Sequence, residues 1–150
     1  MKVPGCPLCD GPGGLPVFSG PKFRVIRAQE PGFPAFYRLV WNDHAAEFTD
    51  LAAPERELCM AAVAEVELLV RQHLKPDKVN LAALGNVVPH LHWHIVARFA
   101  WDSHFPAPVW ASAKREVTPG DLAAVEALLP ALDETIAAHL AFGPGNHTPS

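Results

Sequence analysis

The segment that decides the fold is His90-Leu91-His92-Trp93-His94-Ile95-Val96, in which imidazoles alternate with large apolar side chains. Side chains in a β-strand point to opposite faces in turn, so the three histidines would share one face, with neighbouring rings roughly 6.6 Å apart at their Cα atoms. The intervening apolar residues would then face the core. We therefore predict a strand over residues 90–99 that presents a wall of imidazoles beside a groove.

The segments around this strand predict a mixed fold. Three further apolar or β-branched runs are predicted as strands, at residues 23–29, 35–41 and 78–84. A helix is predicted over residues 54–74, where apolar residues recur at helical spacing and Pro54 suits the first turn. A second helix is predicted from Thr118 to about Leu140, with a kink or break at Pro130. This order favours an α+β fold with an antiparallel sheet and both helices on one side.

Both ends of the chain are predicted to lack regular secondary structure. Residues 1–21 are rich in proline and glycine and are predicted to be a loop that contains Cys6-Pro7-Leu8-Cys9. Residues 143–150 are predicted to be a loose tail. The length of 150 residues fits one domain spanning the whole chain.

Composition restricts the possible partners. The formal net charge is −4 with no basic stripe, which argues against binding to a nucleic acid polymer but not against a nucleotide ligand. No run of 18 apolar residues is present, and the first residues could not form a signal peptide, so we expect a cytoplasmic protein with no membrane partner. Three cysteines make a disulfide framework improbable.

The histidine cluster allows three interpretations. Three structural imidazoles would each need their own hydrogen-bond partners, which makes this the weakest reading. A zinc ion bound by all three would be strained, because the outer pair of Cα atoms on a regular strand is about 13 Å apart. The favoured reading is nucleophilic catalysis, in which a neutral imidazole attacks phosphorus while its other nitrogen is held by a neighbour.

The motif also resembles that of a known family. His-φ-His-φ-His-φ-φ, where φ is apolar, is the signature of histidine-triad (HIT) proteins, and Gly85–Pro89 and His44 with Thr49-Asp50-Leu51 resemble the family's flanking segments. The resemblance covers residues 6–110 and is strongest to bacterial HIT proteins related to diadenosine tetraphosphate hydrolases. It implies a five-stranded antiparallel sheet with two main helices, the fifth strand near Val17-Phe18, and a homodimer formed through a strand and a helix.

The resemblance also implies roles for individual residues. His92 matches the nucleophile, His94 the ring that contacts the phosphate, and His90 the member that supports the site. Asn86 matches an amide that contacts the phosphate, and Asn80 either contacts the phosphate region or holds its strand. Trp93 is bulkier than the usual residue at its position and implies a roomier packing site behind the strand.

The implied activity is a nucleotide hydrolase or transferase acting at the α-phosphate of a dinucleoside polyphosphate or related nucleotide. No organic cofactor is expected, and the chemistry itself needs no metal. The alternatives are a nucleoside phosphoramidase, a non-catalytic zinc-stabilised nucleotide-binding module, and a metal-dependent hydrolase.

A separate motif suggests a structural zinc site. Cys6-x-x-Cys9 supplies half of a four-ligand site, and similarity to some HIT proteins suggests His44 and His90 as the other half. Two buried thiols in a turn are the simpler alternative, and Cys59 is read as a core residue. Trp101 and Trp110 could stack on a base or cover the sheet edge, and His104 could reach the groove or lie in a surface loop. We read the remaining histidines as structural or solvated: His73, His139 and His147.

Overall fold

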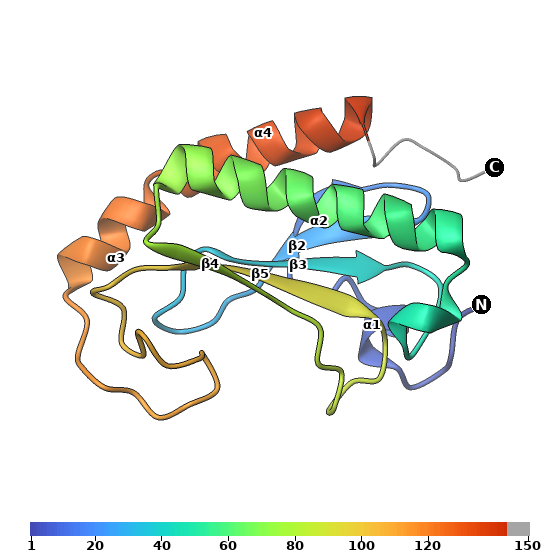
Figure 1. The fold of residues 1–150 in the computed structure, drawn as a ribbon, viewed down its shortest axis with the longest axis horizontal. Coiled ribbons are helices and arrows are strands. Elements are labelled where there is room, and N and C mark those ends of the chain that lie inside the picture. Colours follow the sequence, from blue (N-terminus) through green and yellow to red (C-terminus); the bar gives the residue numbers. More distant parts are fainter. Residues whose placement is uncertain (144–150) are drawn as a thin grey trace.

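The computed structural model describes residues 1–143, and they form one antiparallel sheet with its two long helices on one face (Figure 1). The five strands are β1 (Leu15–Ser19), β2 (Phe23–Arg27), β3 (Phe36–Trp41), β4 (Lys78–Ala82) and β5 (His92–Arg98). Their order across the sheet is β1-β2-β3-β5-β4, and every neighbouring pair is antiparallel. Strand β5 is an interior strand, so the histidine motif lies between β3 and the edge strand β4.

Two long helices, α2 (Ala53–Leu74) and α4 (Leu129–Phe142), cover one face of the sheet. They bury alternate residues of the strands, among them Tyr37, Leu39 and Ile95, in the main apolar core. Trp93 lies on the same face, where its ring packs edge-on against Phe48 at 5.7 Å between centroids. The helices are therefore gathered on one side, as predicted, and the imidazoles of β5 belong to the other face.

Proline residues mark where the helices of this layer begin. Helix α2 has Pro54 in its first turn as predicted, but it begins one residue earlier than expected, so the residue preceding it is Ala52 and not Ala53. The second predicted helix is divided into α3 (Pro119–Glu126) and α4, and Pro130 lies in the first turn of α4. Proline cannot donate an interior helical hydrogen bond, which is why the predicted break occurs just before it.

The N-terminal region differs from the predicted loop. It contains a short helix, α1 (Pro7–Asp10), and the edge strand β1. The fifth strand therefore lies where the resemblance placed it, around Val17-Phe18. The proline and glycine content of this region led to the prediction of a loop. The strand can nevertheless form, because an edge strand tolerates both Pro16 and the irregular register between Pro16 and Phe18.

Strand β5 begins at His92, two residues later than predicted. The preceding residue, Leu91, bonds to the end of β3 and to the segment after it. Its amide donates to the Ala45 carbonyl at 2.7 Å, and its carbonyl accepts from the Trp41 amide at 3.1 Å. These bonds turn the chain at His90, which is completely buried. The three histidines therefore do not form one continuous wall, because His90 leaves the strand.

No helix within the described residues is both long and apolar enough to cross a membrane. The predicted loose tail, including His147, lies outside the described residues apart from Gly143.

Candidate active site

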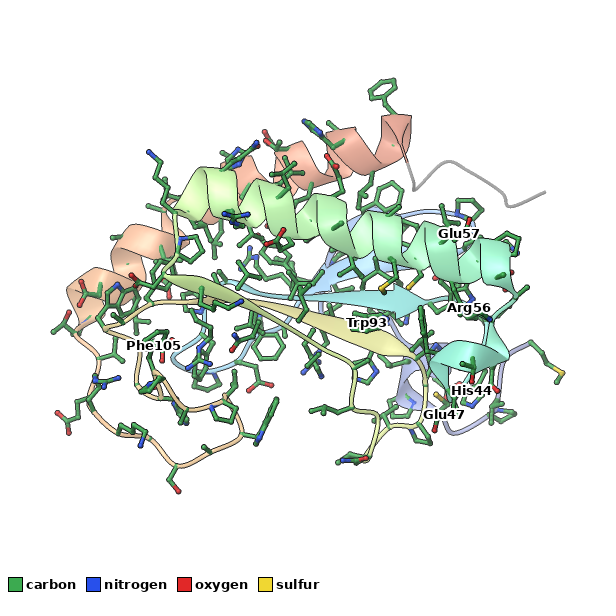
Figure 2. The ribbon with its side chains drawn as sticks, viewed as in Figure 1. His44, Glu47, Arg56, Glu57, Trp93 and Phe105 are labelled. Carbon is green, nitrogen blue, oxygen red and sulfur yellow. The ribbon has the colours of Figure 1, made fainter. Side chains whose placement is uncertain are left out.

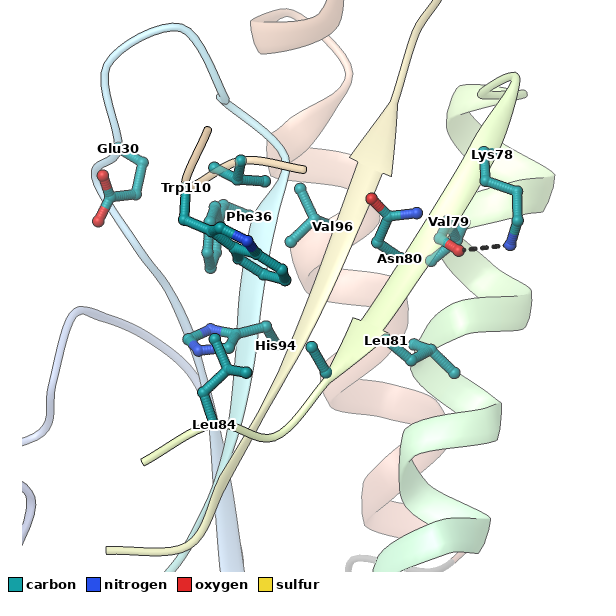
Figure 3. A pocket seen from close by; sticks show the side chains of 12 residues that line it. Glu30, Phe36, Lys78, Val79, Asn80, Leu81, Leu84, His94, Val96 and Trp110 are labelled. Atoms are coloured by element: carbon teal, nitrogen blue, oxygen red, sulfur yellow. Dashed lines mark hydrogen bonds between the residues drawn. The ribbon is translucent and has the colours of Figure 1, made fainter. Parts of the chain in front are cut away.

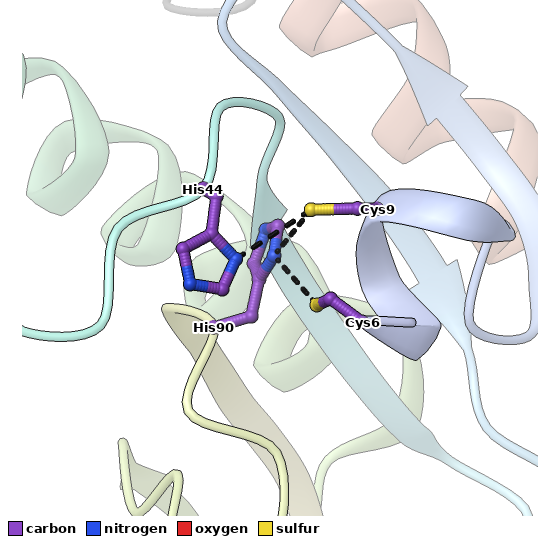
Figure 4. Close-up of side chains that lie close together, drawn as sticks. All are labelled: Cys6, Cys9, His44 and His90. Atoms are coloured by element: carbon purple, nitrogen blue, oxygen red, sulfur yellow. Dashed lines mark hydrogen bonds between the residues drawn. The ribbon is translucent and has the colours of Figure 1, made fainter. Parts of the chain in front are cut away.

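Four metal-ligating side chains from distant parts of the chain meet at one end of the sheet (Figure 4). They are Cys6, Cys9, His44 and His90, and one ligand atom of each lies within 4.8 Å of the other three. The Nδ1 atom of His90 is 3.4 Å from Cys6 Sγ and 3.5 Å from Cys9 Sγ. The Nδ1 atom of His44 is 3.5 Å from Cys9 Sγ. The structure thus brings together all four residues predicted as metal ligands.

The separations in this cluster fit a tetrahedral metal site. Typical Zn–S and Zn–N bond lengths at tetrahedral angles place sulfur and nitrogen about 3.6 Å apart, close to the measured 3.4 and 3.5 Å. The Nε2 atom of His90 is 2.6 Å from the Trp41 carbonyl oxygen. A carbonyl can only accept, so the proton is on Nε2 and Nδ1 presents its lone pair to the cysteines. This is the tautomer that a metal ligand needs.

Arg24 of β2 fastens the cysteine segment to the sheet. Its Nη2 donates to the carbonyls of Leu8 at 2.6 Å and Gly11 at 3.0 Å. Its Nη1 donates to the Asn42 side-chain oxygen at 3.2 Å, in the loop that leads to His44. One guanidinium therefore connects two of the three chain segments that supply ligands to the cluster, a role that the sequence alone did not indicate.

His92 has one ring nitrogen fixed by the backbone and the other left free. Its Nδ1 is 2.6 Å from the carbonyl oxygen of His90, to which it must donate. Within residues 1–143 no hydrogen-bond partner faces its Nε2, which carries the lone pair of the neutral ring. The free nitrogen is therefore the one that can act as a nucleophile.

His94 has the opposite arrangement because of Arg38, its direct cross-strand neighbour on β3. The Nε atom of Arg38 is 3.4 Å from His94 Nδ1. Arginine has no acceptor, so Nδ1 of His94 accepts and Nε2 carries the proton. The rings of His92 and His94 lie edge to face with centroids 5.0 Å apart. The Nε2 lone pair of His92 and the Nε2–H donor of His94 thus belong to neighbouring rings.

Burial keeps these rings neutral. It lowers the pKa of His90 and of His92, and the Arg38 guanidinium further lowers that of His92. Burial, the neighbouring His92 and Arg38 together lower the pKa of His94 to about 4. Near neutral pH both rings of the His92–His94 pair are therefore unprotonated, as nucleophilic attack requires.

Two hollows adjoin the pair. The larger, about 520 Å³, contains His94 and is walled by Phe36, Val96 and Trp110 on the open face of the sheet (Figure 3). The smaller, about 230 Å³, contains His92 and extends toward Trp93 and residues 46–48. Glu47 and Trp93 accordingly lie at the same end of the molecule as His44 (Figure 2).

The two predicted asparagines differ in placement. Asn80 lines the larger hollow, and its Oδ1 accepts a hydrogen bond from Arg98 Nη1 at 2.8 Å. Asn86 is exposed on the loop before His90 and lines neither hollow. The phosphate contact of Asn86 therefore stays a prediction. Arg38 was not predicted, although a charged residue inside the apolar run 35–41 was a signal for it.

The remaining candidates have structural partners. Cys59 is buried in the core, which raises its pKa to about 12. Trp101 stacks on Phe99 at 4.8 Å. His104 is bonded to Ser103 at 2.7 Å and lines neither hollow. The Nδ1 atoms of His73 and His139 lie 3.0 Å from the Leu69 carbonyl and Glu65 respectively, in agreement with a structural role.

Comparisons with known proteins agree with this architecture. A comparison with curated protein sequences finds no match. Among solved structures, a histidine triad protein from Bradyrhizobium japonicum is 30% identical, with 83% of this chain and 92% of that chain covered and a TM-score of 0.69. One from Marinobacter aquaeolei is 26% identical, with coverage of 84% and 93% and a TM-score of 0.66. A zinc-bound histidine triad family protein from Mycobacterium smegmatis shares the fold at 22% identity, with coverage of 88% and 95% and a TM-score of 0.57.

The family model for the HIT domain matches residues 16–101. The match contains the whole sheet except the first residue of β1, together with helix α2 and the histidine motif. With this match over more than half of its length, the chain belongs to the HIT domain family.

Proposed function

We propose that this protein is a nucleotide hydrolase or transferase that cleaves at an α-phosphate through a covalent nucleotidyl-His92 intermediate. The observation that carries the proposal is the fixed tautomer of His92, whose Nδ1 donates to the His90 carbonyl at 2.6 Å. The Nε2 lone pair is thereby available and directed away from the backbone. Membership of the HIT domain family supports a nucleotide ligand.

The proposed reaction has two displacements. The Nε2 lone pair of His92 attacks the α-phosphorus, an N–P bond forms, and the bond from phosphorus to the leaving group breaks with its electron pair going to that group. His92 then carries a positive charge, which the His90 carbonyl stabilises by accepting the short hydrogen bond from Nδ1–H. Water attacks phosphorus in the second step, the N–P bond breaks, and the products are a nucleoside monophosphate, a proton and neutral His92.

His94 has a different task in this proposal. Its Nε2–H donates a hydrogen bond to a phosphate oxygen, where negative charge increases during attack. The Nδ1 bond from Arg38 keeps the donor hydrogen on Nε2. The preferred leaving group in our proposal is a nucleotide, as in a dinucleoside polyphosphate, and an amine is the alternative within the same mechanism.

Mass spectrometry of acid-quenched protein tests this proposal. Wild type and His92→Ala are mixed briefly with a diadenosine polyphosphate and, separately, with an adenosine phosphoramidate. We expect an adenylyl adduct on His92 that is absent from the variant, and its relative rate of formation identifies the leaving group. Binding of nucleotide without adduct or turnover would replace the enzyme by a non-catalytic nucleotide-binding module.

We also propose that Cys6, Cys9, His44 and His90 hold a structural zinc ion. The support is their sulfur–nitrogen separation and the metal-ready tautomer of His90. When bound, zinc would fasten α1 to the loop after β3 and fix His90, whose carbonyl orients His92. A reducing compartment such as the cytoplasm would keep both cysteines reduced and available as ligands.

Metal analysis tests the zinc site separately. We expect one zinc ion per chain by inductively coupled plasma mass spectrometry, and none in Cys6→Ser/Cys9→Ser. Chelation should lower the Tm, because metal binding contributes to folding free energy. Turnover should persist at temperatures where circular dichroism shows the metal-free chain to be folded. Complete loss of turnover in folded, metal-free protein would instead indicate a metal-dependent hydrolase.

We propose, finally, that two copies pair through β4. This strand is one of the two sheet edges, and Leu81, its fourth residue, is 46% exposed. Unpaired edges with exposed apolar residues favour pairing with another strand.

A further inference from the structure

Trp110 differs from the other tryptophans of the chain in its aromatic surroundings within the described residues. Trp41 lies near Phe23, Trp93 near Phe48 and Trp101 near Phe99, with ring centroids at 6.5, 5.7 and 4.8 Å. Within residues 1–143 no ring pairs with the Trp110 indole, which is 66% exposed. The same indole lines the larger hollow beside His94 (Figure 3). A large aromatic face is therefore presented to a cavity and not to the core.

The loop that carries Trp110 is held in place by a buried ion pair and by a second, exposed arginine. Arg98, which is 2% exposed, donates from Nε and Nη2 to the two carboxylate oxygens of Asp102 at 2.8 and 3.1 Å. Its Nη2 also donates to the Ala107 carbonyl at 2.7 Å. Arg115 closes the loop from its far end by donating to the carbonyls of Asp102 and Phe105 at 2.6 and 2.8 Å. The loop backbone that leads to Trp110 is thus fixed before a ligand binds, which reduces the entropy lost on binding.

The cavity lies next to the reacting groups. His94 forms part of its wall, and the His92 ring is 5.0 Å from the His94 ring. Its volume of about 520 Å³ is in the range of small-molecule sites. A nucleotide whose phosphate contacts both histidines can therefore extend its base into this cavity.

We infer that the cavity is the base-binding subsite and that Trp110 stacks on the nucleobase. This inference rests on the proposed function, because it takes the ligand to be a nucleotide. Phe36 and Val96 of the sheet and Val109 of the Trp110 loop give the cavity apolar walls for the base. Its lining also contains three polar side chains: Glu30, Lys78 and Asn80. Stacking on indole requires only a π-face, so the subsite accepts more than one base.

Isothermal titration calorimetry with AMP and with ribose 5-phosphate tests the inference without turnover. In Trp110→Leu, AMP affinity should fall roughly 5- to 150-fold, the range for losing one base–aromatic stack. Ribose 5-phosphate lacks a base, so its affinity should be unchanged. Trp110→Phe keeps an aromatic face and should retain most of the AMP affinity. Phe142→Leu is the matched control, since Phe142 is an exposed aromatic residue on the helix layer.

Equal AMP affinity in wild type and Trp110→Leu would overturn the inference. So would equal losses for AMP and ribose 5-phosphate, which would show that the substitution disturbs the phosphate site. Failure of the wild type to bind AMP would also overturn it. Trp110-dependent AMP binding without any His92 adduct would uphold the subsite and refute only the proposed chemistry.

Discussion

Two histidines of the same strand acquire different chemistry from their partners. His92 donates through Nδ1 to a backbone carbonyl, whereas His94 accepts through Nδ1 from Arg38. Their side chains lie on the same face, and burial lowers the pKa of both. The His90 carbonyl therefore leaves a lone pair on Nε2 of His92, and the Arg38 guanidinium leaves a hydrogen on Nε2 of His94.

Arg38→Met is expected to lower kcat by roughly 10- to 100-fold, a typical effect of removing a partner that orients a functional imidazole. Without the guanidinium, the His94 proton can move to Nδ1, and the donor facing the phosphate is lost. Nitrogen-15 NMR of the His94 ring should show this change of tautomer. Arg71→Met, on the exposed side of α2, is the control. An unchanged kcat together with an unchanged His94 spectrum would refute the assigned role of Arg38.

The low pKa of His94 predicts how stability depends on pH. Its folded-state pKa of about 4 lies below the ordinary value of 6.5, so the unfolded chain binds more protons between these values. The stability contributed by neutral His94 is present above pH 6.5 and is lost as pH falls toward 4. Urea unfolding at pH 7, 6 and 5 should show a steeper decline for wild type than for His94→Asn. Parallel declines would contradict the lowered pKa.

At the scale of single residues, the sequence predicted which histidines form the site better than it predicted the groups that hydrogen-bond to them. Alternation in residues 90–96 was sufficient to identify His92 and His94 as neighbours on one face. It could not show that the chain turns at His90, because that turn depends on bonds to Ala45 and Trp41, far away in sequence. Arg38 meets His94 only through the register of β3 on β5, which no local pattern specifies.

At the scale of elements, Asp133 anchors α4 to the sheet. It accepts a hydrogen bond from the Tyr37 hydroxyl at 2.6 Å and two from Arg27 at 3.0 and 3.2 Å. Tyr37 is completely buried, and burial together with Asp133 raises the pKa of its hydroxyl. The three side chains connect β2, β3 and α4 in one network that the sequence did not indicate, since Asp133 follows Arg27 by 106 residues.

Asp133→Ala should therefore destabilise the fold by about 2–4 kcal/mol, because it leaves a buried hydroxyl and a half-buried guanidinium without their acceptor. For a chain of this size the Tm should fall by roughly 4–16 °C. Scanning calorimetry measures the effect, and nucleotidyl transfer per folded molecule should be unchanged. Glu134→Ala changes the adjacent exposed carboxylate and should leave the Tm nearly constant. Similar losses in both variants would contradict the anchoring role.

For the whole molecule, the sequence predicted the fold class, the helix layer and the meeting of Cys6, Cys9, His44 and His90, whereas its prediction of a loop at the N-terminus was wrong. Its proline and glycine content suggested a loop, but β1 pairs with β2, and Arg24 bonds α1 to the sheet. Local composition cannot show that an edge strand is supplied by tertiary contacts. The same proline content matters for assembly, because the two edges of the sheet are not equivalent.

Edge β1 is poorly suited to pairing with a second chain. Pro16 lacks a backbone donor, and the register shifts between Pro16 and Phe18. Edge β4 has neither feature, and Leu81 is exposed on it. In Figure 3 the Leu81 side chain extends toward α2 and away from His94 and Trp110. A second copy that pairs with β4 would therefore cover Leu81 and leave the histidine pair accessible.

Leu81→Lys should weaken the proposed dimer, because lysine on an edge strand opposes strand pairing. Sedimentation velocity over a range of protein concentrations should show dimer for wild type and a shift toward monomer for the variant. Leu128→Lys, which alters an equally exposed leucine between α3 and α4, should sediment like wild type. A monomeric wild type, or the same shift in both variants, would rule out assembly through β4. Retained nucleotidyl transfer in monomeric Leu81→Lys would show that each active site is complete within one chain.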